Sequence, residues 1–324
     1  MRILIVGSGS IGRRHIRNLQ KLVDRPEFIL LRDAAREDEF SRELGAAVVG
    51  SFADAISLSP AFGVIATPSM LHFEALKALL PARVPCYVEK PVVTSEVQVQ
   101  QLEFLLAGAT AVPTTMVGCN LRFLPSLKKA RQLIRDGVLG RPVRASLQVG
   151  QWLPDWRPAQ DYRQSYSASR ESGGGVVLDL IHELDAARFL FGEFEQIFSI
   201  GGQYSRLEIE SEDSVSIILG RPHGPAVSLG LDYVSRSAVR RYDIIGDEGS
   251  LIWDLPAMTL MLLRKSQQEV VTADPADFDV SATYIEAMQE FLNAIEGSRS
   301  SSQDLSDGLI SARLAVLANR QLRA

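Results

Sequence analysis

The first 120 residues alternate short apolar runs with longer amphipathic segments. Strand-like runs stand at residues 3–6, 28–31, 46–49, 62–66, 86–88 and 112–117. Helical periodicity lies between several of them, at 12–22, 37–44, 71–80 and in a Gln-, Glu- and Leu-rich segment before residue 112. Because parallel strands need a crossover connection, which is usually a helix, this pattern predicts a doubly wound α/β domain with a parallel sheet covered on both faces.

After residue 120 the pattern changes to alternating segments separated by turn residues. A helix is expected at 124–136, with Pro125 near its start and Gly137 after its end. Strands are expected at 143–149, 196–201, 215–219, 226–233, 241–245, 250–253 and 259–264, and closing helices at 284–295 and 305–322. Since few helices intervene between these strands, we predict an antiparallel meander. The boundary near residue 120 then gives two domains, 1–120 and 121–324.

The predicted open sheet has one broad face that the closing helices are too few to cover. Association with further copies of the chain is the expected way to cover such a face. We therefore expect a homodimer or a homotetramer.

Composition narrows the class of partner. The 324 residues are 46% apolar and 23% charged, and 34 basic against 39 acidic residues give a net charge of −5. Without a basic excess, neither nucleic acid nor an anionic membrane is an expected partner. Cys86 and Cys119 are too few for a disulfide framework, and no residue spacing is typical of a metal site. With no signal peptide or membrane span in the pattern, we expect a cytoplasmic protein that binds a small molecule.

The first apolar run leads into a glycine-rich turn, ILIVGSGSIGRRH, at residues 3–15. Gly7, Gly9 and Gly12 follow a strand and open a helix, which is the context of a dinucleotide-binding turn. In such a turn Gly7 permits the tight bend, Gly9 lets the backbone approach a pyrophosphate, and Gly12 allows close packing of helix on strand. The phosphates then lie at the helix N-terminus, beside Ser10 and Ile11. We predict a nicotinamide cofactor.

The end of the second strand leaves the choice between NAD and NADP open. An acidic residue there would bind the ribose 2′-hydroxyl of NAD, whereas an arginine would accept the 2′-phosphate of NADP. Arg32 and Asp33 are adjacent at this point, with Arg36 nearby, so either cofactor fits.

A second chemical feature follows the glycines at 173–175. Asp179 and His182 stand at the opening of an apolar helix, a placement that suggests proton transfer. The alternative for Asp179 is a structural role, as a helix cap or in packing. Asp185, three residues after His182, is a candidate to orient the imidazole or to bind a substrate hydroxyl.

Five motifs in one order resemble the Gfo/Idh/MocA oxidoreductase family, named for glucose-fructose oxidoreductase, inositol dehydrogenase and a rhizopine-catabolism protein. They are the glycine turn, Thr67-Pro68-Ser69-Met70-Leu71-His72, Glu89-Lys90-Pro91, Asn120-Leu121-Arg122-Phe123, and the three glycines with Asp179, His182 and Asp185. The resemblance implies a Rossmann domain and a C-terminal α+β domain with an open, mostly antiparallel sheet. It also implies hydride exchange between NAD or NADP and a sugar, cyclitol or sugar nucleotide.

The resemblance assigns further residues. The family's functional lysine falls on Lys90, at the carboxyl end of a strand, where doubly wound folds bind ligands; a surface lysine beside a turn is the alternative. On the cofactor side the resemblance implies Thr67, Pro68, His72, Glu89 and Asn120. It makes His182 and Asp179 catalytic, but family members commonly place the aspartate four residues before the histidine, whereas here the spacing is three.

An aromatic segment, QWLPDWRPAQDYRQSYS at residues 151–167, precedes the glycines. Aromatic faces stack on sugar rings and arginines bind carboxylates or phosphates, so Trp156, Arg157 and Tyr162 are candidate substrate residues. An aromatic cluster that only packs this loop is the alternative. The sequence as a whole predicts an NAD(P)-dependent oxidoreductase; the rival hypotheses are a nucleotide-binding regulator without turnover and a cofactor-retaining epimerase or lyase.

Overall fold

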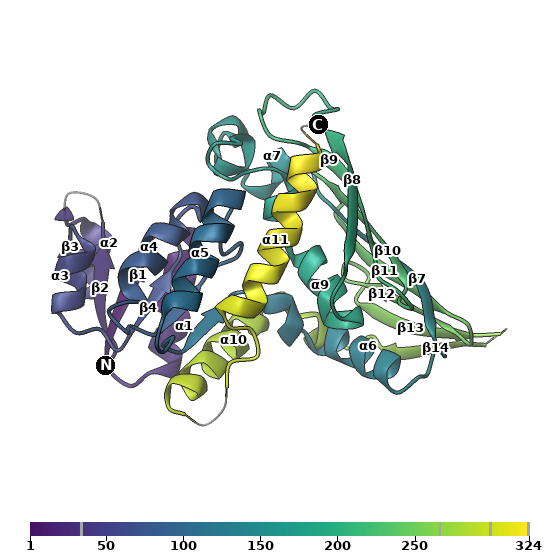
Figure 1. Cartoon of the computed structure of the whole chain (residues 1–324), viewed down its shortest axis with the longest axis horizontal. Helices are drawn as coiled ribbons and strands as arrows, with labels where there is room; N and C mark the ends of the chain where they lie inside the picture. Colours follow the sequence, from purple (N-terminus) through teal and green to yellow (C-terminus); the bar gives the residue numbers. More distant parts are fainter. Residues whose placement is uncertain (33–34, 266, 298–299, 323–324) are drawn as a thin grey trace. The chain divides into compact units, whose positions relative to one another are not determined.

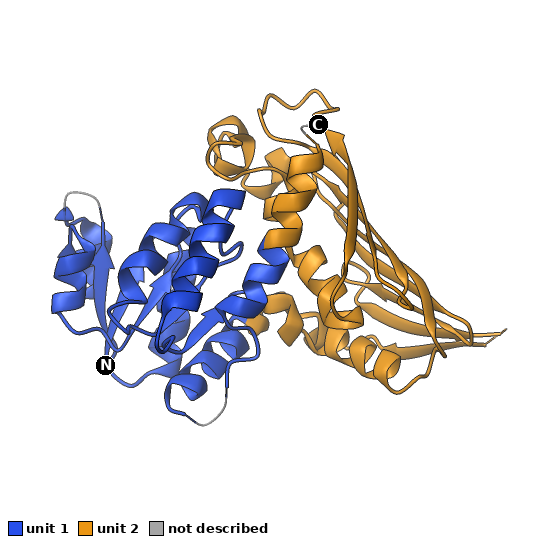
Figure 2. Cartoon of the chain, viewed as in Figure 1, with its two compact units in different colours: residues 1–119, 284–312 blue, residues 120–283, 313–324 orange. Residues whose placement is uncertain are grey.

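The computed structural model describes residues 1–32, 35–265, 267–297 and 300–322. It divides into two compact units, shown in Figure 2. Unit 1 comprises residues 1–119 and 284–312, and unit 2 comprises residues 120–283 and 313–324. The expected division placed all of 121–324 in one domain, whereas residues 284–312 pack with unit 1. Only tertiary contacts reveal this return of the chain.

Unit 1 is built on a six-stranded parallel sheet (Figure 1). In sequence order its strands are β1 (Arg2–Val6), β2 (Glu27–Leu31), β3 (Ala47–Val49), β4 (Phe62–Ile65), β5 (Cys86–Val88) and β6 (Thr115–Val117). In space they are ordered β3-β2-β1-β4-β5-β6. Four successive residues of β1, Ile3 to Val6, are buried, and neighbouring strand residues point to opposite faces, so both faces are covered. The predicted doubly wound domain is confirmed.

Helices follow most of these strands. They are α1 (Ser10–Leu22), α2 (Glu39–Leu44), α3 (Phe52–Ser57), the short turn η2 (Ser69–Leu71), α4 (His72–Leu79) and α5 (Glu96–Gly108). The short α3 was not predicted. Ser51 and Ser95 cap α3 and α5 by accepting backbone N–H groups of the first turn. Two long helices close the chain, α10 (Val280–Ile295) and α11 (Leu305–Gln321), and the stretch from residue 284 to residue 312 belongs to unit 1.

Unit 2 carries an eight-stranded sheet. Its strands are β7 (Pro142–Gly150), β8 (Gln196–Gly202), β9 (Ser214–Gly220), β10 (Ala226–Asp232), β11 (Val239–Gly246), β12 (Ser250–Asp254), β13 (Thr259–Arg264) and β14 (Gln267–Thr272). The mostly antiparallel sheet is confirmed, but the simple meander was wrong. The order is β14-β13-β12-β11-β7-β10-β9-β8, with β7 parallel to β10, because the helical segment after β7 carries the chain to the far edge, where β8 begins. The edge strand β14 was not predicted.

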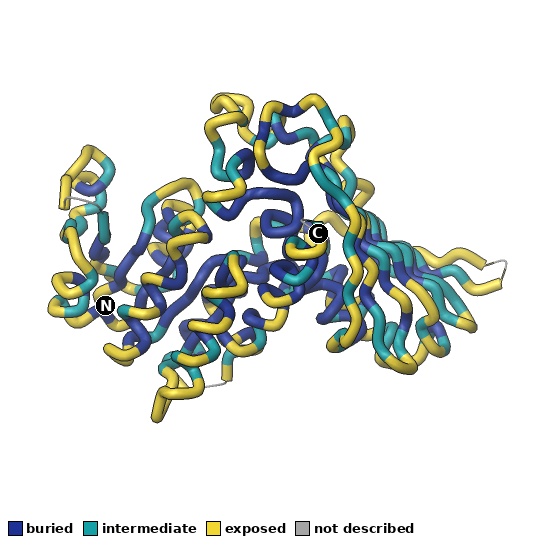
Figure 3. Tube along the Cα trace, turned by 45° about the horizontal axis from the view of Figure 1, so that its top comes forward, coloured by how far each residue is buried: buried dark blue, intermediate teal, exposed yellow. Residues whose placement is uncertain are grey.

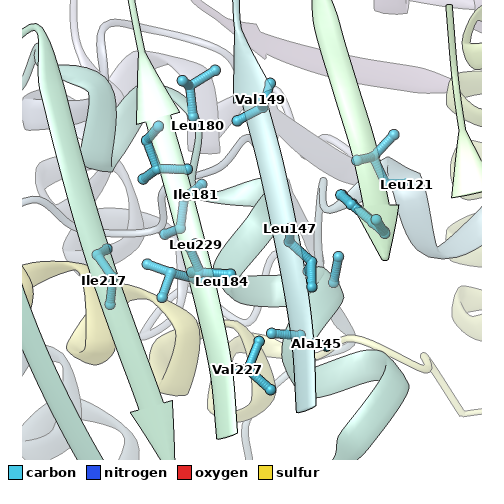
Figure 4. Close-up of a cluster of buried hydrophobic side chains, with 14 of the residues drawn as sticks. Leu121, Ala145, Leu147, Val149, Leu180, Ile181, Leu184, Ile217, Val227 and Leu229 are labelled. Atoms are coloured by element: carbon cyan, nitrogen blue, oxygen red, sulfur yellow. The ribbon is translucent and has the colours of Figure 1, made fainter. Parts of the chain in front are cut away.

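Apolar side chains on one face of this sheet form the core of unit 2. Leu147, Ile217 and Leu229 from three strands pack with Ile181 and Leu184 of the helical segment, as Figure 4 shows. Between β7 and β8 that segment consists of α7 (Leu153–Trp156), α8 (Val176–Asp179) and α9 (His182–Phe191), with the 3₁₀ turns η4 (Tyr162–Gln164) and η5 (Tyr166–Ala168). The turn η3 (Asn120–Phe123) and α6 (Pro125–Arg135) precede β7, and the turn η6 (Pro275–Phe278) follows β14.

The opposite face of the sheet is more exposed. Exposed positions alternate with half-buried ones along β8 and with buried ones along β9. Figure 3 shows buried, intermediate and exposed positions along the chain. Phe198, Ile200 and Ile218 are 65%, 72% and 46% exposed. An exposed face of this kind is the feature from which association was predicted.

Within the described ranges of the chain, no helix is long and apolar enough to cross a membrane. The same ranges contain no group of three or more His, Cys, Asp or Glu side chains arranged to hold a metal ion.

Candidate active site

The glycine turn of unit 1 lies where the strand order of the sheet reverses, between β1 and β4. Doubly wound sheets bind ligands at the carboxyl ends of their strands at this point. Gly7 has a φ of +95°, and a Cβ on it would stand 2.7 Å from the backbone of Ala66 and Thr67. A Cβ on Gly12 would stand 2.1 Å from the Gly7 carbonyl oxygen. Both positions therefore require glycine for the fold itself.

Gly9 differs from its two neighbours, because a Cβ built on it meets no protein atom within 4 Å. It is the N-cap of α1, no side chain caps the helix there, and the first turn carries no acidic residue. Ser10 and Ile11 thus open a helix whose backbone N–H groups and positive dipole end suit an anion. This uncapped helix end with open space beside Gly9 fits the pyrophosphate of a dinucleotide.

Arg32, at the end of β2, contacts an acid. Its Nη1 lies 2.8 Å from Oδ1 of Asp38, the N-cap of α2. The hydrogen bond from Arg32, together with one from the Ser41 backbone, lowers the pKa of Asp38 to about 2. Asp33, the predicted alternative partner of the ribose, lies outside the described residues.

The loop after β4 contains the predicted cofactor residues Thr67 and Pro68. Thr67 Oγ1 is buried and has no hydrogen-bond partner among the described residues, while Pro68 is exposed. His72 is different, because its ring is buried and both nitrogens face backbone oxygens. Nδ1 lies 2.8 Å from the Pro91 carbonyl oxygen and Nε2 lies 3.0 Å from that of Thr67. Because both ring nitrogens of His72 contact the protein backbone, at Thr67 and at Pro91, the structure does not support a direct contact between His72 and the cofactor.

Lys90 follows β5 and is partly exposed, whereas Glu89 before it is buried. The Glu89 carboxylate is held from α1, where Nε2 of the fully buried His15 lies 2.7 Å from Oε1 of Glu89. The structure thus gives Glu89 an internal partner where the sequence suggested a cofactor contact. The Lys90–Pro91 peptide bond is cis.

In unit 2 the predicted single helix is broken between Asp179 and His182. Asp179 ends α8, and His182 begins α9. The helix-cap alternative for Asp179 is wrong, because the N-cap residues are Gly175 and Ile181. The buried Asp179 carboxylate instead accepts a hydrogen bond from Tyr233 Oη at 2.5 Å, and a second from Tyr166. Burial, and then the charge of Asp179, raises the pKa of Tyr233, which keeps its hydroxyl a donor.

Asp179 and His182 line one pocket of about 310 Å³, at the small end of the usual range for ligand sites. All of its lining residues belong to unit 2, and they include Gln151, Trp156, Asp179, His182, Val239 and Arg240. Sequence reasoning did not single out Gln151, the first residue of the aromatic segment, and it missed Arg240, because nothing in a strand pattern indicates which face of β11 meets the pocket.

Arg240 is held by a buried acid next to His182. Its Nε lies 2.8 Å from Oε1 of Glu183, which is fully buried and also accepts from Tyr242 Oη at 3.1 Å. This pair fixes a guanidinium at the pocket wall, where its N–H groups suit hydroxyl or carboxylate oxygens.

Two predicted residues are engaged elsewhere in unit 2. Both oxygens of the buried Asp185 accept from Arg122, at 2.6 and 2.8 Å, so its carboxylate serves an ion pair and does not line the pocket. Asn120 is buried, and its Nδ2 donates to Thr283 Oγ1 at 2.7 Å. These contacts do not favour the expected substrate role of Asp185 or the cofactor role of Asn120.

The three candidate residues of the aromatic segment lie in different surroundings. The Trp156 ring lines the pocket and stacks edge-on against Tyr233, with centroids 5.2 Å apart. Tyr162 packs against the core and its hydroxyl accepts from the Glu208 backbone at 3.3 Å. Arg157 is exposed and lies 5.7 Å from the Tyr166 ring, and it is not among the residues of the pocket. Of the three, Trp156 alone meets the site.

Family models match both parts of the chain. The NAD-binding Rossmann fold of the oxidoreductase family GFO_IDH_MocA matches residues 1–115, and the GFO/IDH/MocA C-terminal domain matches residues 127–252. The chain therefore belongs to the Gfo/Idh/MocA family of oxidoreductases. The resemblance, the oxidoreductase class and the NAD-binding fold predicted from the sequence are confirmed.

Individual relatives differ in the reactions that their names state. Myo-inositol 2-dehydrogenase of Thermotoga maritima is 26% identical, over 99% of this chain and 96% of its own. The 2,7-anhydro-N-acetylneuraminate hydratase of Escherichia coli is 27% identical, over 61% of this chain and 52% of its own. Among solved structures, the WlbA dehydrogenase of Bordetella pertussis, in complex with NADH and UDP-GlcNAcA, has a TM-score of 0.84 at 20% identity and covers 100% of this chain and 95% of that one. This last likeness shows a common fold.

Proposed function

We propose that the protein is an NAD-dependent dehydrogenase that interconverts a hydroxyl and a carbonyl group on a sugar, cyclitol or sugar nucleotide. The observation that carries this proposal is the pocket of unit 2, which brings Asp179, His182 and Arg240 together beside the Trp156 ring. An aromatic face with hydrogen-bonding side chains around it is the surface that a polyhydroxylated ring requires. The glycine turn of unit 1 supplies the place for the nucleotide.

Oxidation of a CH–OH group removes a hydride from carbon and a proton from oxygen. Bound nicotinamide supplies the hydride acceptor. We assign the proton to Lys90 and His182, the two side chains whose type and motif position suit a general acid or base. The Asp179 carboxylate accepts hydrogen bonds from two tyrosine hydroxyls, so we assign it a positioning role in the pocket wall and no proton transfer.

NAD is the proposed cofactor in preference to NADP. An arginine that receives a 2′-phosphate must offer its N–H groups to that phosphate, whereas Arg32 lies 2.8 Å from the Asp38 carboxylate. The negative charge of Asp38 would also repel a phosphate at this position.

Turnover of a panel of sugars, cyclitols, uronates and nucleotide sugars with NAD and NADP tests the proposal. On the substrate that emerges, Lys90→Ala and His182→Ala should each lower kcat by roughly 10²- to 10⁴-fold while NAD binding persists, as for a lost general acid or base. Asp179→Asn should lower kcat without loss of folding. Full activity of Lys90→Ala would overturn the mechanism, and tight NAD binding with no turnover of any substrate would favour the nucleotide-binding regulator.

A cofactor-retaining lyase or epimerase is the second candidate, favoured by the hydratase among the relatives. In such a reaction the hydride leaves the substrate and returns to it, so no NADH accumulates. Mass analysis of the nucleotide carried through purification separates the two candidates. A stoichiometric nucleotide that is retained during turnover, with no net NADH, would favour the lyase.

Association through the exposed face of the unit 2 sheet is also proposed, because Phe198 and Ile200 leave apolar surface in water there. Light scattering at micromolar protein should give a dimer or tetramer mass. A mass of 35.6 kDa would contradict it.

A further inference from the structure

Lys90 stands between two residues that are each held by a buried histidine of unit 1. Glu89, before it, meets His15 at 2.7 Å, and the carbonyl oxygen of Pro91, after it, meets His72 at 2.8 Å. We propose that His15 and His72 are positioning residues, which fasten the chain on both sides of Lys90 to the loops that receive the nucleotide. This inference rests on the proposed role of Lys90.

The His15 link joins Lys90 to the glycine turn. His15 lies on α1 three residues after Gly12, so the helix that begins at the phosphate site carries it. Its ring is fully buried and packs edge-on against Tyr87, with centroids 5.0 Å apart. On the other side of the carboxylate, a Cβ on Gly118 would stand 3.1 Å from Glu89 Oε1. A side chain at position 118 would thus crowd the carboxylate that His15 holds, and glycine there leaves room for it.

The His72 link joins Lys90 to the loop after β4. Nε2 of the ring lies 3.0 Å from the Thr67 carbonyl oxygen, and Thr67 in turn borders Gly7. Burial lowers the pKa of His72, with Glu89 and Lys90 as the charged groups near the ring, so the neutral ring with one N–H prevails. A neutral ring donates from one nitrogen at a time, and the shorter contact, from Nδ1, is the one to the Pro91 carbonyl oxygen beside the lysine.

A merely structural role for the two histidines would affect folding and leave Lys90 unchanged in the folded protein. The reactivity of the Lys90 amine separates the two roles. We would pulse the folded protein with acetic anhydride and measure acetylation of each lysine by mass spectrometry. Lys77, whose side chain is 62% exposed, serves as the internal reference.

The His15 arm uses a matched pair of variants. His15→Phe removes the donor to Glu89, whereas His15→Gln keeps an amide N–H near the position of Nε2. In His15→Phe we expect the rate of Lys90 acetylation, relative to that of Lys77, to rise roughly 2- to 10-fold, which corresponds to the free energy of one lost hydrogen bond. In His15→Gln this relative rate should return to that of the original chain. If His15→Phe fails to fold, Glu89→Ala breaks the same contact from the other side and must give the same rise.

The His72 arm separates its two contacts. His72→Asn places an amide near the position of Nδ1 and keeps the link to Pro91. His72→Gln places it near Nε2 and keeps only the link to Thr67. We expect His72→Gln to raise Lys90 acetylation and His72→Asn to leave it close to the original rate.

A kinetic arm follows once a substrate is identified. His15→Phe and His72→Gln should lower kcat by about 10²-fold, as a small displacement of a reacting group does, with the Kd for NAD unchanged and with recovery in His15→Gln and His72→Asn. Unchanged Lys90 acetylation in folded His15→Phe and His72→Gln would overturn the inference. Acetylation needs neither substrate nor nucleotide, so absence of dehydrogenase activity would contradict the proposed function while the acetylation result still decides the positioning role.

Discussion

The two regions that carry the expected chemistry are built from different groups. The carboxyl ends of the unit 1 strands present mainly backbone, namely the glycine turn and the carbonyl oxygens that face His72. The pocket of unit 2 presents side chains, which buried partners hold in place, such as Glu183 for Arg240 and Tyr233 for Asp179. A site made of backbone is specified by a short local motif. A site made of paired side chains depends on contacts between residues far apart in the chain.

The largest effect on binding is expected at Gly9, in the backbone site of unit 1. A valine there meets no protein atom but occupies the space needed for a pyrophosphate, so Gly9→Val should abolish NAD binding with little loss of stability. Gly108→Val is a matched control, because its Cβ also meets nothing within 4 Å. Calorimetric titration measures both, and unchanged affinity in Gly9→Val would remove the dinucleotide site from this turn.

In unit 2 the corresponding variant removes the ion-pair partner of a buried carboxylate. Arg122→Ala removes the bidentate donor of the buried Asp185 carboxylate and leaves it the guanidinium of Arg188, 3.6 Å away. We expect the free energy of unfolding to fall by about 1.5–3 kcal/mol, the range for a lost hydrogen bond to a charged group. Urea denaturation of Arg122→Ala and of the double variant Arg122→Ala/Asp185→Asn gives the measurement. The double variant should recover part of the loss, and equal stability of Arg122→Ala and the original chain would show that Asp185 has no need of Arg122.

A smaller effect is expected at the ribose end of unit 1. Asp38→Asn keeps a good N-cap for α2 but removes the charge that engages Arg32. The preference for NADP relative to NAD should rise by at least about 10-fold, the worth of one hydrogen bond to a charged group. Glu39→Gln makes the same charge change one residue away. If the two variants gave the same ratio of Kd values, Arg32 would not contact the phosphate.

The smallest effect concerns pH and His72. Burial lowers the pKa of His72, so below its ordinary pKa of about 6.5 the unfolded chain binds more protons than the folded one. The stability that this histidine contributes is therefore present above that pH and is lost as pH falls toward the lowered pKa. Between pH 7 and 5 the unfolding free energy should fall more steeply in the original chain than in His72→Asn, by at most about 1.4 kcal/mol per pH unit for one proton. Parallel curves in urea denaturation would contradict this.

The sequence alone determined the parallel sheet of unit 1 and the place of its nucleotide turn. Apolar runs that alternate with amphipathic segments predict parallel strands joined by helical crossovers. The glycine motif after the first strand is local, because the turn that it forms spans only about a dozen residues. It also determined that the second sheet is mostly antiparallel and that the chain is a Gfo/Idh/MocA oxidoreductase, through motifs that stand in order along the chain.

Tertiary structure decided what depends on distant contacts. Nothing in the pattern of β7 places it beside β10 and parallel to it, and nothing before β14 indicates an eighth strand. Tyr233, the partner of Asp179, lies 54 residues away in the chain, and Arg122, the partner of Asp185, lies 63 residues away. Helical periodicity describes only neighbouring residues, so it could not predict either contact. Local sequence specifies backbone conformation, whereas the hydrogen-bond partner of a buried side chain is chosen by the whole fold, because a buried polar group must be satisfied by whatever the packing brings to it.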